Sequence, residues 1–232
     1  MKITAALPWF NEKIDDLDRC VRGLVNVADK LVALDGSYVR YPGAKAKSPI
    51  GQVDAIQRAA DAIGIECEIV QPDTIWAGQV EKRSHLVKLA SVGSDWICTL
   101  DADQIITANR KDVRTILEVT DADVFEVIYY TPNDKTRPKI ERSVGLWHEE
   151  QAGSRVWIPH IYRVYPEMRV ERFHWWYSAV KNGERVWLWS RGDGEYPMIQ
   201  HYPFPIPYEV EHRTLFRSKE QILNSRAFCN DR

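Results

Sequence analysis

The expected fold follows from one stretch of the chain, Trp96-Ile97-Cys98-Thr99-Leu100-Asp101-Ala102-Asp103. Its apolar, β-prone residues are typical of a buried strand of a parallel sheet, and they end abruptly in two carboxylates. Ligands of open α/β sheets bind just beyond the carboxyl ends of such strands. Carboxylate oxygens at that place suit a hard divalent cation that also holds a diphosphate. The stretch therefore predicts a Mg²⁺ or Mn²⁺ site, although an acidic pair after a strand can also cap a helix or solvate a turn.

The composition is that of an ordinary globular protein. The chain has 232 residues, of which 44% are hydrophobic and 28% are charged, and its formal net charge is -2. This size allows one α/β domain with a substantial core. A net charge so close to zero does not indicate a broad footprint for nucleic acid, and we expect no nucleic-acid partner.

The sequence also favours a cytoplasmic location without a membrane span. No apolar run approaches the length of a transmembrane helix. The apolar stretch at 3–7 is followed by Pro8-Trp9-Phe10-Asn11-Glu12 rather than by a cleavage site of small residues, which favours a core strand over a signal peptide. The four scattered cysteines have neither zinc-site spacing nor the density of a disulfide framework, which is typical of a reduced compartment.

Strand and helix signals alternate through the first half of the chain. Strands are expected at 3–7, 30–34, 66–70 and 96–100, and helices at 14–27, 53–63 and 80–92, with Gly64 as the C-cap of the second helix. Strands separated by helices predict a parallel sheet with right-handed crossovers. The predicted fold class is therefore α/β, with a Rossmann-like, mostly parallel central sheet and flanking helices.

The second half differs in its pattern of predicted elements and in its aromatic content. A helix is expected at 111–119 and a strand at 124–130, followed by polar turns and many tryptophans. Tryptophans in such a region either pack in the core or stack on sugars and bases, and the pattern leaves both readings open. A closing helix with a basic face is expected to begin at Tyr208.

Several motifs occur in an order that is informative. They are Leu7-Pro8-Trp9-Phe10-Asn11-Glu12, Val32-Ala33-Leu34-Asp35-Gly36-Ser37, Glu81-Lys82-Arg83-Ser84, the stretch ending at Asp103, Ile161-Tyr162-Arg163-Val164-Tyr165-Pro166-Glu167-Met168-Arg169, Phe173-His174 and Met198-Ile199-Gln200-His201-Tyr202. With these motifs the chain resembles the GT-A glycosyltransferases, and more narrowly their family 2 type. The segment 35–49, with Trp76-Ala77-Gly78, is also similar to small glycosyltransferases of actinobacteria and their phages.

The resemblance implies a GT-A fold and transfer of a sugar from a nucleoside-diphosphate sugar, UDP first and GDP second, to a hydroxyl of a glycan, protein or small molecule. It implies one domain with a nucleotide-binding half at 1–103, an acceptor-binding and metal-completing half at 104–207 and a C-terminal helix at 208–232. The residues implied to bind the nucleotide sugar are Pro8, Asn11, Glu12, Asp35, Gly36, Lys82, Arg83, Asp101, Ala102 and Asp103.

Each of these site residues has a chemical reason for its expected role and a simpler structural explanation that competes with it. The Asp35 carboxylate can accept hydrogen bonds from N3–H of uracil or N1–H and N2–H of guanine, or it can belong to a turn. The Arg83 guanidinium can pair with phosphate, or it can lie on the surface. His201 is expected to join Asp101 and Asp103 as the third ligand of Mn²⁺ (or Mg²⁺), or it is a histidine held by hydrogen bonds at a strand end.

The catalytic base is left open by the sequence. Members of the family often have an acidic residue directly after the histidine that His174 matches, and this chain has Trp175 there. Glu149 and Glu150 are the available substitutes, so the candidate catalytic residues are His174 and these two glutamates. Solvation in a loop is the more frequent explanation of such glutamates, and inversion and retention of the sugar's configuration both stay open.

Two other functions compete with sugar transfer. A sugar nucleotidyltransferase shares the sheet and the metal-binding carboxylates, but no glycine-rich, basic phosphate loop follows the first predicted strand. A sugar-binding or virion-associated protein without enzymatic activity would use the tryptophans as stacking platforms. The intact pair of Asp101 and Asp103 argues against this second alternative.

Overall fold

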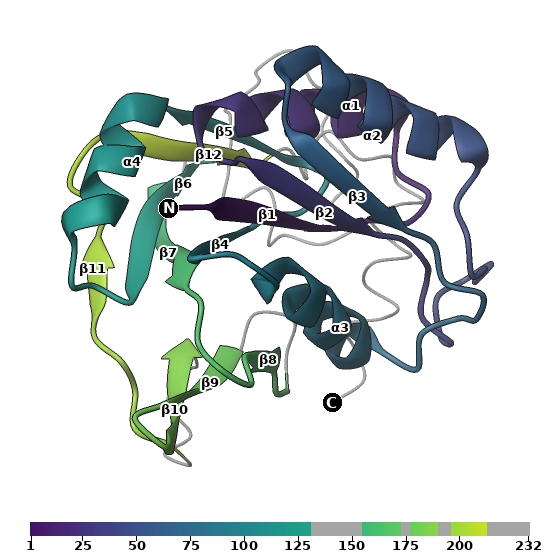
Figure 1. Cartoon of the computed structure of the whole chain (residues 1–232). Helices are drawn as coiled ribbons and strands as arrows, with labels where there is room; N and C mark the ends of the chain where they lie inside the picture. The colour runs from purple at the N-terminus through teal and green to yellow at the C-terminus, as the bar shows by residue number, and fades with distance from the viewer. Residues whose placement is uncertain (131–154, 173–176, 190–195, 213–232) are drawn as a thin grey trace.

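The structure, a computed structural model, describes residues 1–130, 155–172, 177–189 and 196–212. Its first half alternates strands and helices as the sequence predicts, and every bound lies within four residues of the expected one (Figure 1). The strands are β1 (Ile3–Pro8), β2 (Lys30–Leu34), β3 (Glu66–Val70) and β4 (Trp96–Thr99). The helices are α1 (Ile14–Gly23), which continues as a 3-10 turn at Leu24–Asn26, α2 (Ile50–Ile63) and α3 (Gln79–Ser91).

The described residues of the second half contain one further helix and eight further strands. The helix α4 (Arg110–Val119) and the strand β6 (Val124–Tyr130) agree with the expected elements. The remaining strands are β5 (Gln104–Ala108), β7 (Arg155–Arg163), β8 (Arg169–Val170), β9 (Tyr177–Lys181), β10 (Glu184–Trp189), β11 (His201–Pro203) and β12 (Tyr208–His212).

The expected α/β fold with a mostly parallel central sheet is confirmed. Nine strands form this sheet in the order β3-β2-β1-β4-β7-β6-β12-β5, with β11 paired to β6 (Figure 1). The strands β1 to β4 are parallel, whereas β7 runs antiparallel between β4 and β6, and β5 runs antiparallel to β12. The carboxyl ends of β1 to β4 therefore meet at one edge. A second sheet has the order β10-β9-β8.

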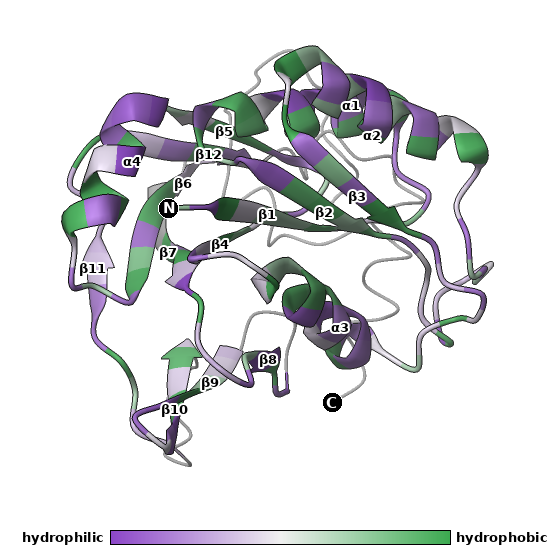
Figure 2. Cartoon of the chain, viewed as in Figure 1, coloured by the Kyte–Doolittle hydropathy of each residue, from purple (hydrophilic) through white to green (hydrophobic). Residues whose placement is uncertain are grey.

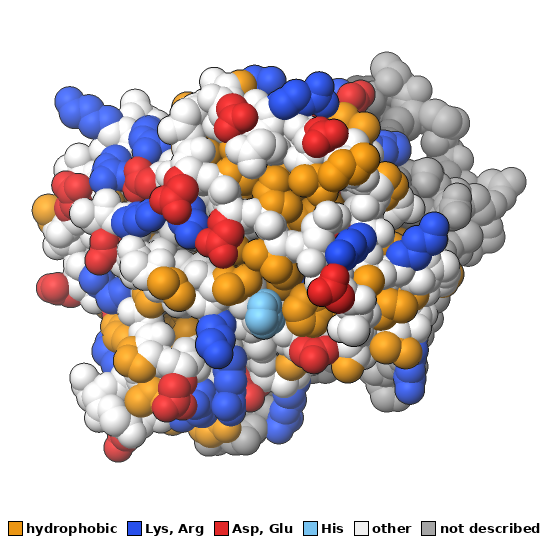
Figure 3. All heavy atoms as spheres, turned by 45° about the vertical axis from the view of Figure 1, so that its right-hand side comes forward, with side chains coloured by type: hydrophobic (Ala, Val, Ile, Leu, Met, Phe, Trp, Pro, Cys, Tyr) orange, Lys and Arg blue, Asp and Glu red, His pale blue; other side chains and the backbone are white. Residues whose placement is uncertain are grey.

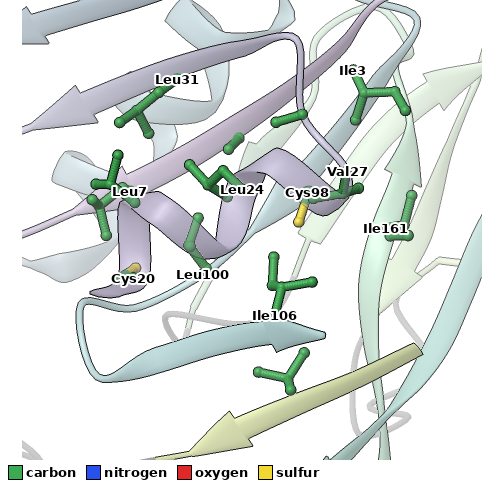
Figure 4. Close-up of a cluster of buried hydrophobic side chains, with 14 of the residues drawn as sticks. Ile3, Leu7, Cys20, Leu24, Val27, Leu31, Cys98, Leu100, Ile106 and Ile161 are labelled. Atoms are coloured by element: carbon green, nitrogen blue, oxygen red, sulfur yellow. The ribbon is translucent and has the colours of Figure 1, made fainter. Parts of the chain in front are cut away.

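Two apolar clusters cover the two faces of the central sheet. Side chains of α1, α2 and α4 pack on one face, where Leu24, Ile106 and Ile161 are fully or almost fully buried (Figure 4). On the other face, α3 contributes Leu86 and Val87 to a cluster that includes side chains of the small sheet. Figure 2 shows the same division as green sides of the helices turned toward the sheet and purple sides turned away. The small sheet is thus anchored to the fold through α3.

The prediction of a closing helix is wrong at its beginning. Residues Tyr208–His212 form the strand β12 between β5 and β6. Tyr208 and Val210 are buried, and they alternate with the more exposed Glu209. Alternation with a period of two is the pattern of a strand, and it outweighs the helix propensity of the glutamates. Residues 213–232 lie outside the described part of the chain.

The surface carries charges of both signs. On the face drawn in Figure 3, acidic and basic side chains are interspersed with apolar ones. Among the described helices, none has both the length and the apolar character needed to cross a membrane.

Candidate functional site

The first turns of α3 tie together the ends of the parallel strands. Lys82 lies in the first turn, and its Nζ donates hydrogen bonds to the carbonyl oxygen of Trp9 (2.7 Å) just after β1 and to that of Gly36 (2.7 Å) just after β2. The neighbouring Arg83 reaches Asp101, which follows β4. Two basic side chains of one helical turn therefore meet three strand ends at the edge where ligands of such sheets bind.

Burial changes the acid–base behaviour of Lys82. The side chain is only 1% exposed, and burial lowers its pKa from 10.5 to about 7, against the opposing effect of the Asp35 charge. A neutral amine has two N–H donors, which match the two carbonyl acceptors that surround it. A lysine perturbed in this way at a ligand-binding edge is a candidate for anion binding, because a bound anion restores its charge.

Arg83 and Asp101 form a close ion pair at the same edge. Arg83 Nη2 lies 2.5 Å from Asp101 Oδ1, and the side chains are 11% and 32% exposed. Burial acts to lower the pKa of the Arg83 guanidinium, but the charge of Asp101 outweighs it and the net shift is upward. The Nε of Arg83 is buried without a hydrogen-bond partner among the described residues, whereas the Tyr177 hydroxyl is hydrogen-bonded to Arg83.

The turn from Asp101 to Asp103 is anchored rather than loose. The Asp101 N–H donates to Gln104 Oε1 (2.9 Å), and the Gln104 N–H donates back to the Asp101 carbonyl (3.0 Å). Ala102 is 2% exposed and packs in the core, and Asp103 is 4% exposed. The two carboxylates are hard oxygen donors of the kind that Mg²⁺ and Mn²⁺ take. Among the described residues no group of three His, Cys, Asp or Glu side chains could hold a metal ion.

Asp35 is placed at the edge but has different contacts from those expected. It is fully buried. Its Oδ1 accepts from the Gly36 N–H (2.7 Å) and the Ser48 hydroxyl (2.6 Å), and its Oδ2 accepts from the Ser48 N–H (2.7 Å) and Gln71 Nε2 (2.8 Å). Four donors fill the capacity of a carboxylate. Asp35 therefore organises the loop after β2, and it faces that loop rather than an open nucleobase site.

Gly36 is required by the backbone at this point. Its φ is +101°, and a Cβ atom would lie 2.8 Å from the Ala46 carbonyl oxygen and from Trp76 Nε1. The Trp76 Nε1 donates to the Asp35 carbonyl (2.8 Å), which closes the loop over the strand end. A side chain at position 36 would therefore force this packed loop apart.

The remaining predicted residues of the first turn lie at the same edge. Pro8 is the buried last residue of β1. Asn11 has a φ of +50°, and its N–H donates to Ser48 Oγ (2.9 Å). The Glu12 N–H donates to Gln52 Oε1 (3.2 Å). The β1 turn and the β2 loop are thus joined through Ser48 and Gln52, which pattern reasoning had no signal to find because they lie in a loop and a helix far along the chain.

His201 is not brought to the two aspartates. Its Nδ1 lies 3.2 Å from Glu126 Oε1, its Nε2 lies 2.7 Å from the Leu188 carbonyl oxygen, and its ring packs beside Trp189. The strand β11 runs beside the first residues of β6, level with the start of β4 and not with its carboxyl end. The alternative of a histidine held by hydrogen bonds at a strand end is the one that the structure shows.

Three predicted catalytic residues, Glu149, Glu150 and His174, lie outside the described part of the chain. A groove of about 940 Å³ lies on another side of α3, between this helix and residues 164–169, and it is lined by residues that include Trp76, His85 and Tyr165. Sequence reasoning did not expect this groove.

Neither a protein-family profile nor a curated protein sequence matches this chain. Solved structures similar to it include S. aureus TarS, with a TM-score of 0.44, 15% identity, and coverage of 72% of this chain and 31% of that chain. A Bacillus anthracis protein assigned as a glucose-1-phosphate thymidylyltransferase has a TM-score of 0.42, 13% identity, and coverage of 69% and 71%. The 4-diphosphocytidyl-2C-methyl-D-erythritol synthase of Anaerococcus prevotii has a TM-score of 0.38, 10% identity, and coverage of 70% and 71%.

Proposed function

We propose that this chain is a glycosyltransferase that uses a nucleoside-diphosphate sugar. The observation that carries the proposal is the joining of three strand ends by Lys82 and Arg83, beside the carboxylates of Asp101 and Asp103. Two buried basic side chains next to a pair of hard oxygen donors suit a diphosphate at the ligand-binding edge of the sheet. The resemblance of the ordered motifs to GT-A glycosyltransferases supports the same function.

In this proposal Arg83 and Lys82 neutralise the diphosphate. The guanidinium of Arg83 can form two parallel hydrogen bonds to phosphate oxygens, and its ion pair with Asp101 holds it ready at the strand end. Lys82 adds a second charge when an anion binds, because the anion favours the protonated amine. Both side chains come from a helix and not from a loop, so their direction is set before the donor arrives.

Asp101 and Asp103 would hold a divalent cation, Mn²⁺ or Mg²⁺, between the protein and the diphosphate. Such a cation supplies charge neutralisation on the departing nucleoside diphosphate. His201 has no part in this site. The bound diphosphate and water would complete the ligand set, because the described residues supply no third ligand of the His, Cys, Asp or Glu type beside the pair.

The nucleotide and the acceptor are the less constrained parts of the proposal. UDP is the first candidate and GDP the second. Since the Asp35 carboxylate is filled by the loop 36–48 and Gln71, base recognition is assigned to backbone and side-chain groups around that loop rather than to Asp35 itself. The acceptor is a hydroxyl of a glycan, protein or small molecule, and Glu149, Glu150 and His174 are kept as candidates for its activation.

The test is a thermal-shift screen of nucleoside diphosphates and their sugars, with and without Mn²⁺, followed by an assay of nucleoside-diphosphate release. A ligand at 100 times its dissociation constant adds about 2.7 kcal/mol of stability, which is readily visible. We expect UDP or UDP-sugars with Mn²⁺ to give the largest shift. Equal UDP affinity with Mn²⁺ and with EDTA would remove the metal from the proposal.

Matched variants and two further assays separate the alternatives. Asp103→Asn should abolish transfer and keep the fold, whereas Asp121→Asn, at an exposed position outside the site, should change neither. Pyrophosphate release from a nucleoside triphosphate and a sugar phosphate would identify a nucleotidyltransferase instead. Binding of glycans that needs neither nucleotide nor metal, without turnover, would identify a sugar-binding protein.

A further inference from the structure

A chain of hydrogen bonds runs inside the central sheet and ends on the backbone of the Asp101–Asp103 turn. Five neighbouring strands or their ends contribute to it. Its contacts are Tyr208 Oη to Cys98 Sγ (3.5 Å), Cys98 Sγ to His160 Nε2 (3.0 Å), His160 Nδ1 to Tyr129 Oη (2.9 Å), Tyr129 Oη to Gln104 Oε1 (3.3 Å) and Gln104 Oε1 to Asp101 N (2.9 Å).

The direction of the protons follows from the end of the chain at Asp101. A backbone N–H only donates, so the Gln104 atom that faces the Asp101 N–H must be the amide oxygen. That oxygen only accepts, so the Tyr129 hydroxyl donates its single proton to it. The Tyr129 oxygen must then accept from His160, which requires a proton on His160 Nδ1.

The other half of the chain follows from the histidine. With its proton on Nδ1, neutral His160 presents Nε2 as an acceptor, and the Cys98 S–H donates to it. The Cys98 sulfur then accepts from the Tyr208 hydroxyl. Tyr208, Cys98, His160 and Tyr129 each donate once along the chain, and Gln104 Oε1 accepts from both sides, so no two protons meet and the chain is satisfied in one direction. Fully satisfied buried networks are rigid and specify one arrangement.

Burial keeps this arrangement constant over the working range of pH. His160 and Cys98 are both fully buried. Burial lowers the pKa of His160 to about 3, against a smaller opposing effect of Asp101, and burial raises the pKa of Cys98 to about 12. Both groups therefore stay neutral between pH 5 and pH 9, and the direction of the chain does not reverse.

We propose that Tyr129 and His160 are positioning residues that hold the Asp101–Asp103 turn through Gln104. They act by orienting the amide whose oxygen accepts from the Asp101 N–H. The purpose of holding the turn, which is to place the carboxylates for the nucleoside diphosphate, rests on the proposed function. The mechanical part of the inference does not, and it is tested separately.

The first test uses the unmodified protein without any ligand. Nitrogen-15 spectra of the histidine rings should show His160 as the neutral Nδ1–H tautomer and unchanged from pH 8 to pH 5, where exposed histidines titrate. A His160 in the Nε2–H tautomer, or one that gains a proton in this range, would overturn the chain of bonds.

The second test measures amide hydrogen exchange at Asp101 in two single variants. Tyr129→Phe removes the hydroxyl in the chain and should speed exchange at Asp101 roughly fivefold, the factor expected for one lost hydrogen bond of average strength. Tyr162→Phe is the matched control, because its buried hydroxyl donates to the Pro159 carbonyl (3.1 Å) and takes part in none of the bonds of this chain. Equal exchange in Tyr129→Phe and the unmodified protein, or an equal rise in the control, would overturn the inference.

The third test connects the turn to the donor. Tyr129→Phe should weaken binding of UDP with Mn²⁺ severalfold, and Tyr162→Phe should not. If Asp101 exchange rises in Tyr129→Phe and nucleotide affinity stays unchanged, the positioning of the turn stands and its proposed purpose fails. If the unmodified protein binds no nucleoside diphosphate at all, the proposed function fails, while the tautomer and exchange results still decide the positioning role.

Discussion

Arg83 Nη2 lies 2.5 Å from Asp101 Oδ1, so the basic group expected to bind phosphate already holds the carboxylate expected to bind metal. A divalent cation at Asp101 would meet the positive charge of Arg83 and would have to share or displace its contact. The pair therefore balances two opposing demands of one site, and removal of Arg83 should change the binding of metal and of nucleotide in opposite directions.

The first prediction concerns Arg83→Gln. Binding of Mn²⁺ alone should tighten severalfold, because a repelling charge is removed from beside Asp101. Binding of UDP with Mn²⁺ should weaken at least tenfold, since a hydrogen bond to a charged group contributes about 1.5–3 kcal/mol. Titration calorimetry measures both affinities. A fall in both affinities would mean that Arg83 only stabilises the turn.

The second prediction concerns the pH dependence of stability that comes from Lys82. The folded-state pKa of Lys82 is about 7, below that of an unfolded lysine at about 10.4. Between these values the unfolded chain binds a proton that the folded chain lacks, so the free energy of unfolding should rise with pH, by up to about 1.4 kcal/mol per unit. Below pH 7 Lys82 is protonated in both states, so the free energy of unfolding no longer changes with pH because of Lys82.

Urea unfolding from pH 6 to pH 9 measures this slope. Lys82→Met should flatten it, whereas Lys88→Met, at an exposed position of the same helix, should leave it as it is. Identical slopes in the unmodified protein and Lys82→Met would show that Lys82 keeps its ordinary protonation when folded.

The third prediction concerns Asp35→Asn. The amide would turn an N–H₂ group toward donors that now point at a carboxylate, so the variant should lose about 3 kcal/mol of stability. Asp73→Asn, an exposed carboxylate bonded to Lys47 in the same region, should lose well under 1 kcal/mol. An Asp35→Asn variant that keeps its stability but prefers GDP to UDP would show that Asp35 recognises the nucleobase.

The fourth prediction compares two glycines with positive φ. Gly36→Ala places a Cβ 2.8 Å from backbone and ring atoms, whereas Gly43→Ala, at φ +67°, meets nothing within 4 Å. Backbone strain alone costs about 1–2 kcal/mol at either position. We expect Gly36→Ala to lose at least about 1 kcal/mol more than Gly43→Ala in denaturant unfolding. Equal losses of stability in the two variants would show that the loop at 36–48 rearranges to accommodate the added Cβ at little cost.

The fifth prediction concerns His201→Gln. The histidine links β6 to β10 through Glu126 and the Leu188 carbonyl. The variant should lose about 1–2 kcal/mol of metal-free stability and keep its affinity for Mn²⁺. Loss of Mn²⁺ affinity at unchanged stability would return His201 to the metal site.

Local pattern was sufficient for the first half of the fold. The strands at 30–34 and 66–70 have the predicted bounds, and Gly64 caps α2 in the left-handed conformation with φ +70°. Periodicity and glycine placement act over a few residues, so one sequence contains the information. The same reasoning fails at β12, where residues 208–210 alternate as in a strand although the charged residues beyond them favour a helix.

The sequence is enough to place carboxylates and basic residues after the parallel strands, and the common direction of such strands brings their ends to one edge. The contacts of each of these side chains depend on the tertiary structure. The Asp35 carboxylate accepts hydrogen bonds from Ser48 and Gln71, and His201 pairs with Glu126 at the other end of the sheet. These partners come from loops and strands distant in sequence, and their approach depends on packing that no local pattern encodes.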